Sequence, residues 1–129
     1  MRFFAVLLLS FFLPAAAFAE EGGPRAFTPC RACHSLDPAE RGLPGPNLSG
    51  LIGRTVAGDP AFDYSPALRK AHDDGLRWDE KRLDTFLTDP AAMFPGLWMS
   101  MPGIEDAAER QALVKLLAAP FPGRGAAYQ

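Results

Sequence analysis

The stretch Cys30-Arg31-Ala32-Cys33-His34 carries the most specific chemical pattern in this sequence. It has the form C-x-x-C-H, which is the attachment pattern of c-type haem. Two thiols three residues apart on one turn can both reach the vinyl groups of one porphyrin, and the next residue then places an imidazole under the iron. We therefore predict one covalent haem c, attached through Cys30 and Cys33, with His34 as the proximal iron ligand.

The cysteine pair also admits three other interpretations. A thioredoxin-like redox motif requires a βαβ pattern around it, and none is visible. A zinc site requires a second pair of ligands, but the chain has only 2 Cys, and His72 is the only histidine besides His34. A lone disulfide or a chance pattern is the third interpretation. The N-terminal sequence favours haem over all three.

The first 19 residues have the organisation of a secretory signal peptide. Met1-Arg2 gives a short positive start, an apolar run extends from Phe3 to Leu13, and Ala17-Phe18-Ala19 has the Ala-x-Ala form of a cleavage site. The apolar run is short for a membrane span, which favours cleavage after Ala19 over an uncleaved N-terminal anchor. Because bacterial c-type haem is attached outside the cytoplasm, we predict a periplasmic protein.

Length and charge limit the rest of the chain to one small domain. The 129 residues carry 15 Asp+Glu against 13 Lys+Arg, a formal net charge of −2, and are 48% hydrophobic. This balance lacks the basic character of nucleic-acid-binding proteins and is too apolar for wholesale disorder. No repeat, low-complexity tract or linker divides residues 20–129, so we predict a single domain there.

The spacing of apolar and helix-breaking residues predicts an all-α domain of about four to five short helices. One short helix, weakened by Pro29, is expected within residues 23–33. Further helices are expected after Ser65-Pro66, after Asp79 and after Asp106, because each of these resembles a helix start. Asp89-Pro90 is expected to end the helix that follows Asp79.

Two further features concern the packing of these helices. Leu113, Leu116 and Leu117 are expected to form the buried face of the last helix. Residues 36–63 contain many Pro and Gly and little periodicity, which predicts a long ordered loop. Something other than secondary structure must organise a loop of that length.

From Gly23 to about Leu117 the chain resembles the class I cytochrome c family. The resemblance rests on short motifs that follow one another in the family's order. They are Gly23 and Phe27, Gly45-Pro46-Asn47-Leu48, Gly50-Leu51-Ile52-Gly53-Arg54, Phe62-Asp63-Tyr64-Ser65, Trp78, and Pro95-Gly96-Leu97-Trp98-Met99. The resemblance implies that the haem is the core of the domain and that residues 36–63 wrap around it. It also implies that Phe27 packs against the last helix.

The resemblance implies His34 and Met99 as the two iron ligands. Met93, Met101 and His72 remain alternatives for the sixth ligand. A Met in a loop more often fills a gap in the core than binds a metal, and His72 lies in a polar segment. The P-G-x-x-M pattern selects Met99.

The resemblance also implies which residues surround the porphyrin. The Pro46 carbonyl would accept a hydrogen bond from the other ring nitrogen of His34, and Leu48 would pack on the porphyrin. Donors near the haem propionates would come from Arg54, Tyr64 and Trp78. Without the resemblance, each of the three has an ordinary interpretation: Arg54 in solvent, Tyr64 at a helix start and Trp78 in the core. Phe86 stands where many relatives carry Tyr, near the axial Met.

The function that the resemblance implies is one-electron transfer in the periplasm, with no substrate bond made or broken. The implied partners are redox proteins, with no nucleic acid, and a membrane would be met only through partner complexes. A monomer is the default expectation. Two alternatives are the electron-entry subunit of a periplasmic dehydrogenase or oxidase complex, and a haem-based sensor with an open sixth coordination site.

Trp98 departs from the family's pattern. Mitochondrial relatives carry Lys there, within a ring of lysines at the haem edge, whereas residues 93–98 contain no basic residue. Two hypotheses follow. Either Trp98 belongs to an apolar docking patch for a partner, with weak electrostatic steering, or it folds over the haem and shields it.

Overall fold

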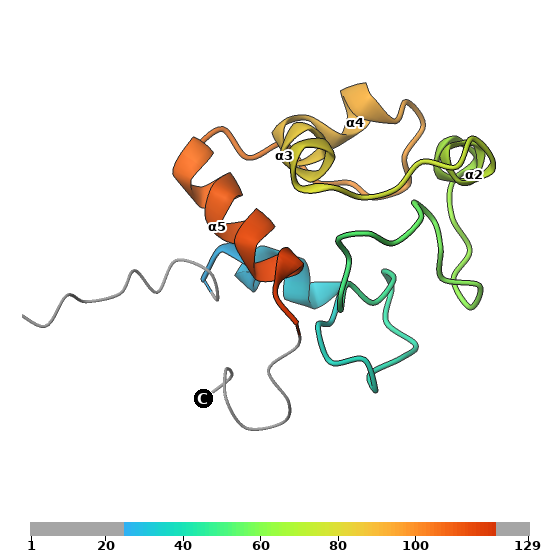
Figure 1. The fold of residues 1–129 in the computed structure, drawn as a ribbon, viewed down its shortest axis with the longest axis horizontal. Coiled ribbons are helices and arrows are strands. Elements are labelled where there is room, and N and C mark those ends of the chain that lie inside the picture. Colours follow the sequence, from blue (N-terminus) through green and yellow to red (C-terminus); the bar gives the residue numbers. More distant parts are fainter. Residues whose placement is uncertain (1–24, 121–129) are drawn as a thin grey trace, which may run out of the picture.

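Short helices joined by irregular segments make up residues 25–120, the part of the chain that the computed structural model describes (Figure 1). They are the 3₁₀ helix η1 (Thr28–Ala32) and the α-helices α2 (Pro66–Asp73), α3 (Glu80–Thr88), α4 (Pro90–Met93) and α5 (Ala107–Ala118). The predicted all-α class is confirmed. The predicted leader, residues 1–19, lies outside the described residues. Crossing a bilayer would take a longer and more apolar helix than any found in residues 25–120.

Side-chain caps explain where the three longer helices begin. Ser65 Oγ accepts a hydrogen bond from the Leu68 amide, and Pro66 provides a first residue that needs no amide partner. The carboxylates of Asp79 and Asp106 cap α3 and α5 by accepting from the amides three residues later. These three predicted starts are therefore confirmed.

The segment after α3 differs from the prediction. The sequence predicts only that the helix ends at Asp89-Pro90, and α3 does end at Thr88. Asp89 then accepts a hydrogen bond from the Ala92 amide at 3.0 Å, and Pro90 opens the one-turn helix α4. Proline breaks a preceding helix but is favoured as the first residue of a new one. The same dipeptide therefore ends α3 and begins α4.

The helix expected within residues 23–33 is present only in part: Arg25 and Ala26 are α-helical, and the element that follows is tighter. Residues Thr28–Ala32 form a 3₁₀ helix, entered by a bond of 2.9 Å from the Cys30 amide to the Phe27 carbonyl. Pro29 has no amide hydrogen to donate, so a regular α-helical ladder is interrupted there. This short turn brings the cysteine pair to the end of the element.

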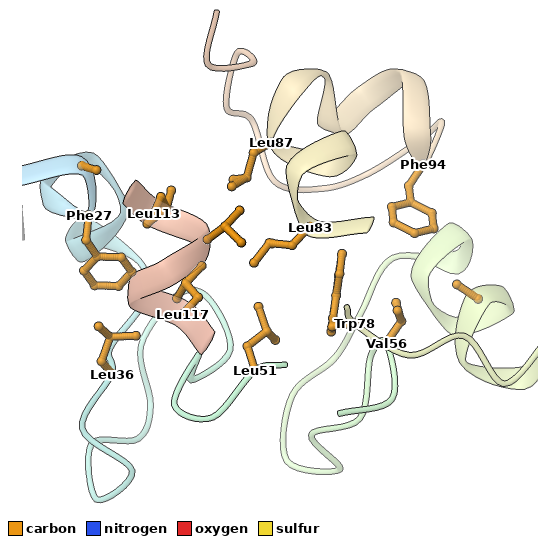
Figure 2. Packing of buried hydrophobic residues seen from close by; sticks show 13 residues of the cluster. Phe27, Leu36, Leu51, Val56, Trp78, Leu83, Leu87, Phe94, Leu113 and Leu117 are labelled. Carbon is orange, nitrogen blue, oxygen red and sulfur yellow. The ribbon is translucent and has the colours of Figure 1, made fainter. Parts of the chain in front are cut away.

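The hydrophobic core lies between α3 and α5 and is extended by Phe27, just before η1, and by side chains of the irregular segments (Figure 2). From α5, Leu113, Val114 and Leu117 are buried. The prediction that Leu116 belongs to this face is only partly right, because its side chain is half-buried while Val114 is buried. Figure 2 shows the reason: α5 is covered by Phe27 on one side and by α3 on the other. The buried face of α5 therefore differs from the one that the leucine spacing predicts.

Residues 36–63 form an irregular segment, as predicted, and its later part is tied to the segment before α3. The Gly53 amide donates to the Trp78 carbonyl at 2.7 Å, and the Trp78 amide donates to the Arg54 carbonyl at 2.9 Å. Between them, Thr55 and Arg77 form the single β-bridge found in the described residues. These bonds bring Arg54 and Trp78 next to each other.

Candidate haem-binding site

The two cysteines and the following histidine lie at the end of η1. The His34 amide donates to the Cys30 carbonyl at 2.9 Å, so the three side chains belong to one turn of backbone. Both thiols are free, with Cys30 half-buried and Cys33 exposed. Burial, and then the neighbouring Cys33, raise the pKa of the Cys30 thiol. A raised pKa is the opposite of what an activated redox thiolate needs, and both sulfurs are available for covalent attachment.

One hydrogen bond orients the His34 imidazole. Its Nδ1 lies 2.8 Å from the Pro46 carbonyl oxygen, the contact that the sequence analysis anticipated. A carbonyl only accepts, so Nδ1 carries the hydrogen and Nε2 keeps its lone pair. Burial lowers the pKa of His34, against the opposing effect of the bond to Pro46, and so favours the neutral ring. A neutral imidazole with a free Nε2 is the form that binds iron. The side chain fits the predicted cofactor.

Gly45 allows the chain to pass close to this ring. Its amide donates to the Cys33 carbonyl at 2.8 Å. A Cβ at position 45 would lie 2.5 Å from His34 Cε1 and 2.7 Å from His34 Nδ1. These distances leave no room for a side chain. Gly45 therefore leaves room for the His34 ring, and the Pro46 carbonyl accepts its hydrogen bond.

Arg54 and Tyr64 are both held by nearby backbone. Arg54 Nη1 donates to the carbonyls of Asn47 at 2.9 Å and Ser49 at 3.1 Å. The Tyr64 hydroxyl accepts from the Asp59 amide at 3.4 Å. Burial is the main cause of a raised pKa for Tyr64, and the Arg54 guanidinium acts in the opposite direction. The two side chains therefore lie within electrostatic reach of each other.

An open polar depression of about 290 Å³ adjoins Arg54. Its lining includes Arg41 and Asp59, whose charged atoms lie 3.6 Å apart. Tyr64 and Trp78 do not line it. The depression therefore does not gather the three side chains that the sequence analysis placed around the propionates. Backbone hydrogen bonds join Trp78 to Gly53 and Arg54, and the Arg54 guanidinium lowers the pKa of Tyr64 against the larger effect of burial.

Trp78 and Phe86 belong to an aromatic cluster that also contains Phe94. The ring centroids of Trp78 lie 5.2 Å from Phe86 and 6.4 Å from Phe94, both with edge-to-face geometry. Phe94 is buried, and no contact with the haem was predicted for it. Its position directly before Pro95-Gly96 is the only sequence feature that points to it. Leu48 is half-buried against the same hydrophobic core.

The four candidates for the sixth ligand have different surroundings. Met93 and Met101 are half-buried and pack against the hydrophobic core. Met99 is also half-buried, but within the described chain it is not one of the side chains packed on that core. His72, on α2, donates from Nδ1 to the Val56 carbonyl at 3.0 Å. Three of the four candidates therefore have a structural role that is visible without haem.

Trp98 is exposed, with 59% of its surface accessible. The guanidinium carbon of Arg69 lies 5.8 Å from the centroid of its ring, which is within the range of a cation–π contact. The Trp98 ring therefore faces a cationic side chain of α2.

The zinc interpretation of the cysteine pair lacks ligands. Within residues 25–120, no three side chains of His, Cys, Asp or Glu are grouped so that they could hold a metal ion. A haem iron requires only His34 and one further side chain, because the porphyrin supplies the remaining ligands.

Comparison with known proteins gives relatives over most of the chain, although no family model matches it. Cytochrome c2 from Agrobacterium tumefaciens (strain II Chrys) is 40% identical over 95 residues, which are 74% of this chain and 86% of that protein. Cytochrome c2 iso-2 from Magnetospirillum fulvum is 36% identical over 94 residues, 73% of this chain and 94% of that protein. Among solved structures, cytochrome cH from Methylobacterium extorquens matches with a TM-score of 0.66 and 36% identity, covering 74% of this chain and 93% of that chain.

Proposed function

The chain belongs to the cytochrome c2 family of class I c-type cytochromes, and from this premise we propose that His34 and Met99 are the two axial ligands of its haem iron. The protein is an electron carrier and not an enzyme, and its haem c is attached covalently through Cys30 and Cys33. When bound, the haem supplies a one-electron Fe(II)/Fe(III) couple. The side chains of this protein bind, orient and shield that group.

The orientation of His34 is the observation that carries the proposal. Its Nδ1–H is committed to the Pro46 carbonyl at 2.8 Å, so the ring cannot turn freely, and Nε2 faces away from that bond. Burial favours the neutral ring, which keeps the lone pair available for iron. The carbonyl partner also makes the ring a better electron donor to a metal.

The surroundings of the methionines support Met99 as the second ligand. Met93 and Met101 pack on the hydrophobic core, whereas Met99 is half-buried outside that set of contacts. A thioether ligand raises the reduction potential, as an electron carrier of this class requires.

The remaining predicted haem contacts are part of the same proposal. Leu48 and Phe86 would supply apolar surface, since both are half-buried against the core. Hydrogen bonds to the propionates would come from Arg54, Tyr64 and Trp78. Arg54 and Tyr64 are within electrostatic reach of each other, and Trp78 is bonded through its backbone to Arg54. Burying a propionate without such donors would be costly.

The partners of this electron carrier are redox proteins. The finer proposal is a periplasmic monomer, with residues 1–19 removed as a signal peptide and residues 20–129 as its one domain. Mass spectrometry of the protein isolated from the periplasm would test the cleavage after Ala19. Co-purification with a large dehydrogenase or oxidase would instead favour the electron-entry subunit.

The first test is the visible absorption spectrum of protein made in cells that attach c-type haem. It is recorded oxidised, reduced, and reduced with carbon monoxide. We expect sharp low-spin bands, haem that resists acid extraction, and no response to carbon monoxide. High-spin bands with ready carbon monoxide binding would mean an open sixth site, and the sensor interpretation would then replace the carrier.

Two matched variants test the choice of methionine. Met99→Leu is expected to abolish the weak charge-transfer band of the Met sulfur–ferric iron bond and to admit carbon monoxide to the reduced protein. Met101→Leu changes a half-buried methionine two residues away and is expected to keep both properties. Loss of the band in Met101→Leu, with the band retained in Met99→Leu, would reassign the ligand.

A further inference from the structure

One arginine of α2 contacts two segments that are far apart in the sequence. Arg69 Nη1 donates to the Asp63 carboxylate at 2.8 Å and to the Tyr64 carbonyl at 2.5 Å, both in the segment that leads into α2. Its guanidinium carbon lies 5.8 Å from the ring centroid of Trp98. Figure 1 shows the segment after α4 passing beside α2. Arg69 therefore connects the entry to α2 with the loop that contains Met99.

The chemistry of these contacts suits a clamp. A guanidinium is planar, so it can donate hydrogen bonds along its edge while its face lies against an aromatic ring. The Asp63 pair by itself is weak, because its carboxylate is 81% exposed and surface ion pairs contribute little. The bond to the Tyr64 carbonyl is partly buried and charge-assisted, which makes it the stronger of the two. Together the two bonds hold the guanidinium in one orientation against Trp98.

The Met99 loop is attached to the rest of the domain by few backbone hydrogen bonds. In the described chain, residues 98–103 neither donate nor accept a backbone-to-backbone hydrogen bond. The nearest such bonds lie at its two ends, from the Leu97 amide to the Phe94 carbonyl and from the Ile104 amide to the Leu87 carbonyl. Between these ends the loop is held by packing, since Met101 lies against the hydrophobic core and Gly103 lies directly against the backbone of Thr88. The contact of Trp98 with Arg69 is next to Met99 in the sequence.

We propose that Arg69 is a positioning residue that holds the Met99 loop closed through Trp98, and thereby sets how readily Met99 leaves the iron. This inference rests on the proposed ligation by Met99. It assigns the exposed Trp98 an intramolecular role that requires no partner protein. It also explains how an indole that is 59% accessible keeps a defined position.

The experiment measures the binding of imidazole to the ferric haem protein, because imidazole displaces a Met ligand only when the loop opens. Arg69→Gln removes the charge over the Trp98 ring, and is expected to raise the imidazole association constant roughly five- to thirty-fold. Arg69→Lys keeps the charge but loses the planar face, so we expect a smaller increase. The charge-transfer band of the Met–iron bond reports the same opening without added ligand.

Lys70→Gln is the matched control. Lys70 is the next residue of α2 and also carries an exposed cation, but its partner at 2.8 Å is Asp74 of the same helix end. This variant is expected to leave imidazole binding within about two-fold of the wild type. A general loss of stability in α2 would change imidazole binding in both variants, whereas loss of the clamp would change it only in Arg69→Gln.

A double-mutant cycle with Trp98→Leu completes the test. If Arg69 acts through Trp98, Arg69→Gln adds little to imidazole binding once Trp98 has been replaced. Equal imidazole binding by Arg69→Gln and Lys70→Gln, or additive effects of Arg69→Gln and Trp98→Leu, would overturn the clamp while leaving the ligand assignment intact. A wild type without the Met–iron band would instead overturn the ligation itself, and the clamp with it.

Discussion

His34 and Met99 lie on segments that the chain secures by different means. On both sides of His34, backbone hydrogen bonds join its segment to residues 45–48. The Gly45 amide donates to the Cys33 carbonyl at 2.8 Å, and the Leu48 amide donates to the Ser35 carbonyl at 2.9 Å. Around Met99, residues 98–103 make no backbone-to-backbone hydrogen bond in the described chain, and the contacts are the approach of Arg69 to Trp98, the packing of Met101 on the core and that of Gly103 on Thr88.

The difference separates a fixed ligand from an exchangeable one. Backbone bonds that flank His34, together with its own bond to Pro46, leave the imidazole few alternatives. Side-chain contacts are individually weak and lose rotamer entropy when they form, so a loop held by them opens at a lower cost. We therefore expect any exchange of iron ligands to begin on the Met99 side.

The largest effect is expected from Gly45→Ala on the His34 side. The new methyl group would meet His34 Cε1 at 2.5 Å and the Cys33 carbonyl oxygen at 2.8 Å, so either the ring or the backbone must shift. We expect a loss of about 2 to 3 kcal/mol in the free energy of unfolding, measured in urea, with a changed low-spin spectrum. The comparison variant is Gly50→Ala, where the new Cβ would meet nothing within 4 Å, so that only the strain of its φ of 58° remains, about 1 to 2 kcal/mol, and the low-spin spectrum should not change. An equal loss in both variants would contradict the steric argument.

Gly96→Ala tests the Met99 side. Gly96 has a φ of 83° in the turn closed by the bond from Leu97 to Phe94, and no atom lies within 4 Å of a Cβ built there. The cost is therefore backbone strain alone, about 1 to 2 kcal/mol. We expect imidazole to bind the ferric protein more tightly, because the strain falls on the loop that must open.

Gly75→Ala is the control for that prediction. Gly75 has a φ of 73° and equally open space, but it lies just after α2. It should lose similar stability without a change in imidazole binding. If both variants bind imidazole equally, loop strain is not what controls opening.

His72→Ala is expected to lower stability without affecting either ligand. It removes the donor to the Val56 carbonyl, which belongs to a fully buried residue, and should cost about 1 kcal/mol in urea unfolding. The spectrum and the imidazole affinity should stay as in the wild type. A spectral change would mean that His72 approaches the iron, which would revive it as a ligand candidate.

The smallest effect concerns Tyr64 at high pH. Burial raises the pKa of this phenol in the folded protein above its ordinary value near 10. The folded state therefore keeps the proton while the unfolded state loses it, so stability is full below pH 10 and falls as the pH rises through the folded pKa. Urea unfolding of the reduced protein between pH 8 and pH 11 should show this fall. Tyr64→Phe should flatten it, and an unchanged slope would exclude Tyr64 as the cause.

Several parts of the site were predictable, most of them because they depend on short spacings. The C-x-x-C-H motif, the capping residues Ser65, Asp79 and Asp106, and the pairing of Pro46 with His34 all appear in the structure as anticipated. Caps and motifs act within one turn of chain, so their geometry follows from residue type and spacing. The pairing of His34 with Pro46 came from the family resemblance, because its two residues are distant in sequence.

Other features were missed for physical reasons. Val114 rather than Leu116 completes the buried face of α5, because that face is set by what covers the helix from two sides. α4 was missed because Asp89-Pro90 reads as a helix end and also works as a helix start. Phe94 joins the aromatic cluster without belonging to any periodic pattern.

The haem attachment motif, the all-α class and the starts of the longer helices follow from the order of residues alone, because they depend on groups a few residues apart. The approach of Arg69 to Trp98 and the bond of His72 to Val56 became visible only in the folded chain. Those contacts join loops without periodicity, and no local preference specifies which loops meet. The packing of the whole chain settles that choice, and with it how firmly each side of the iron site is held.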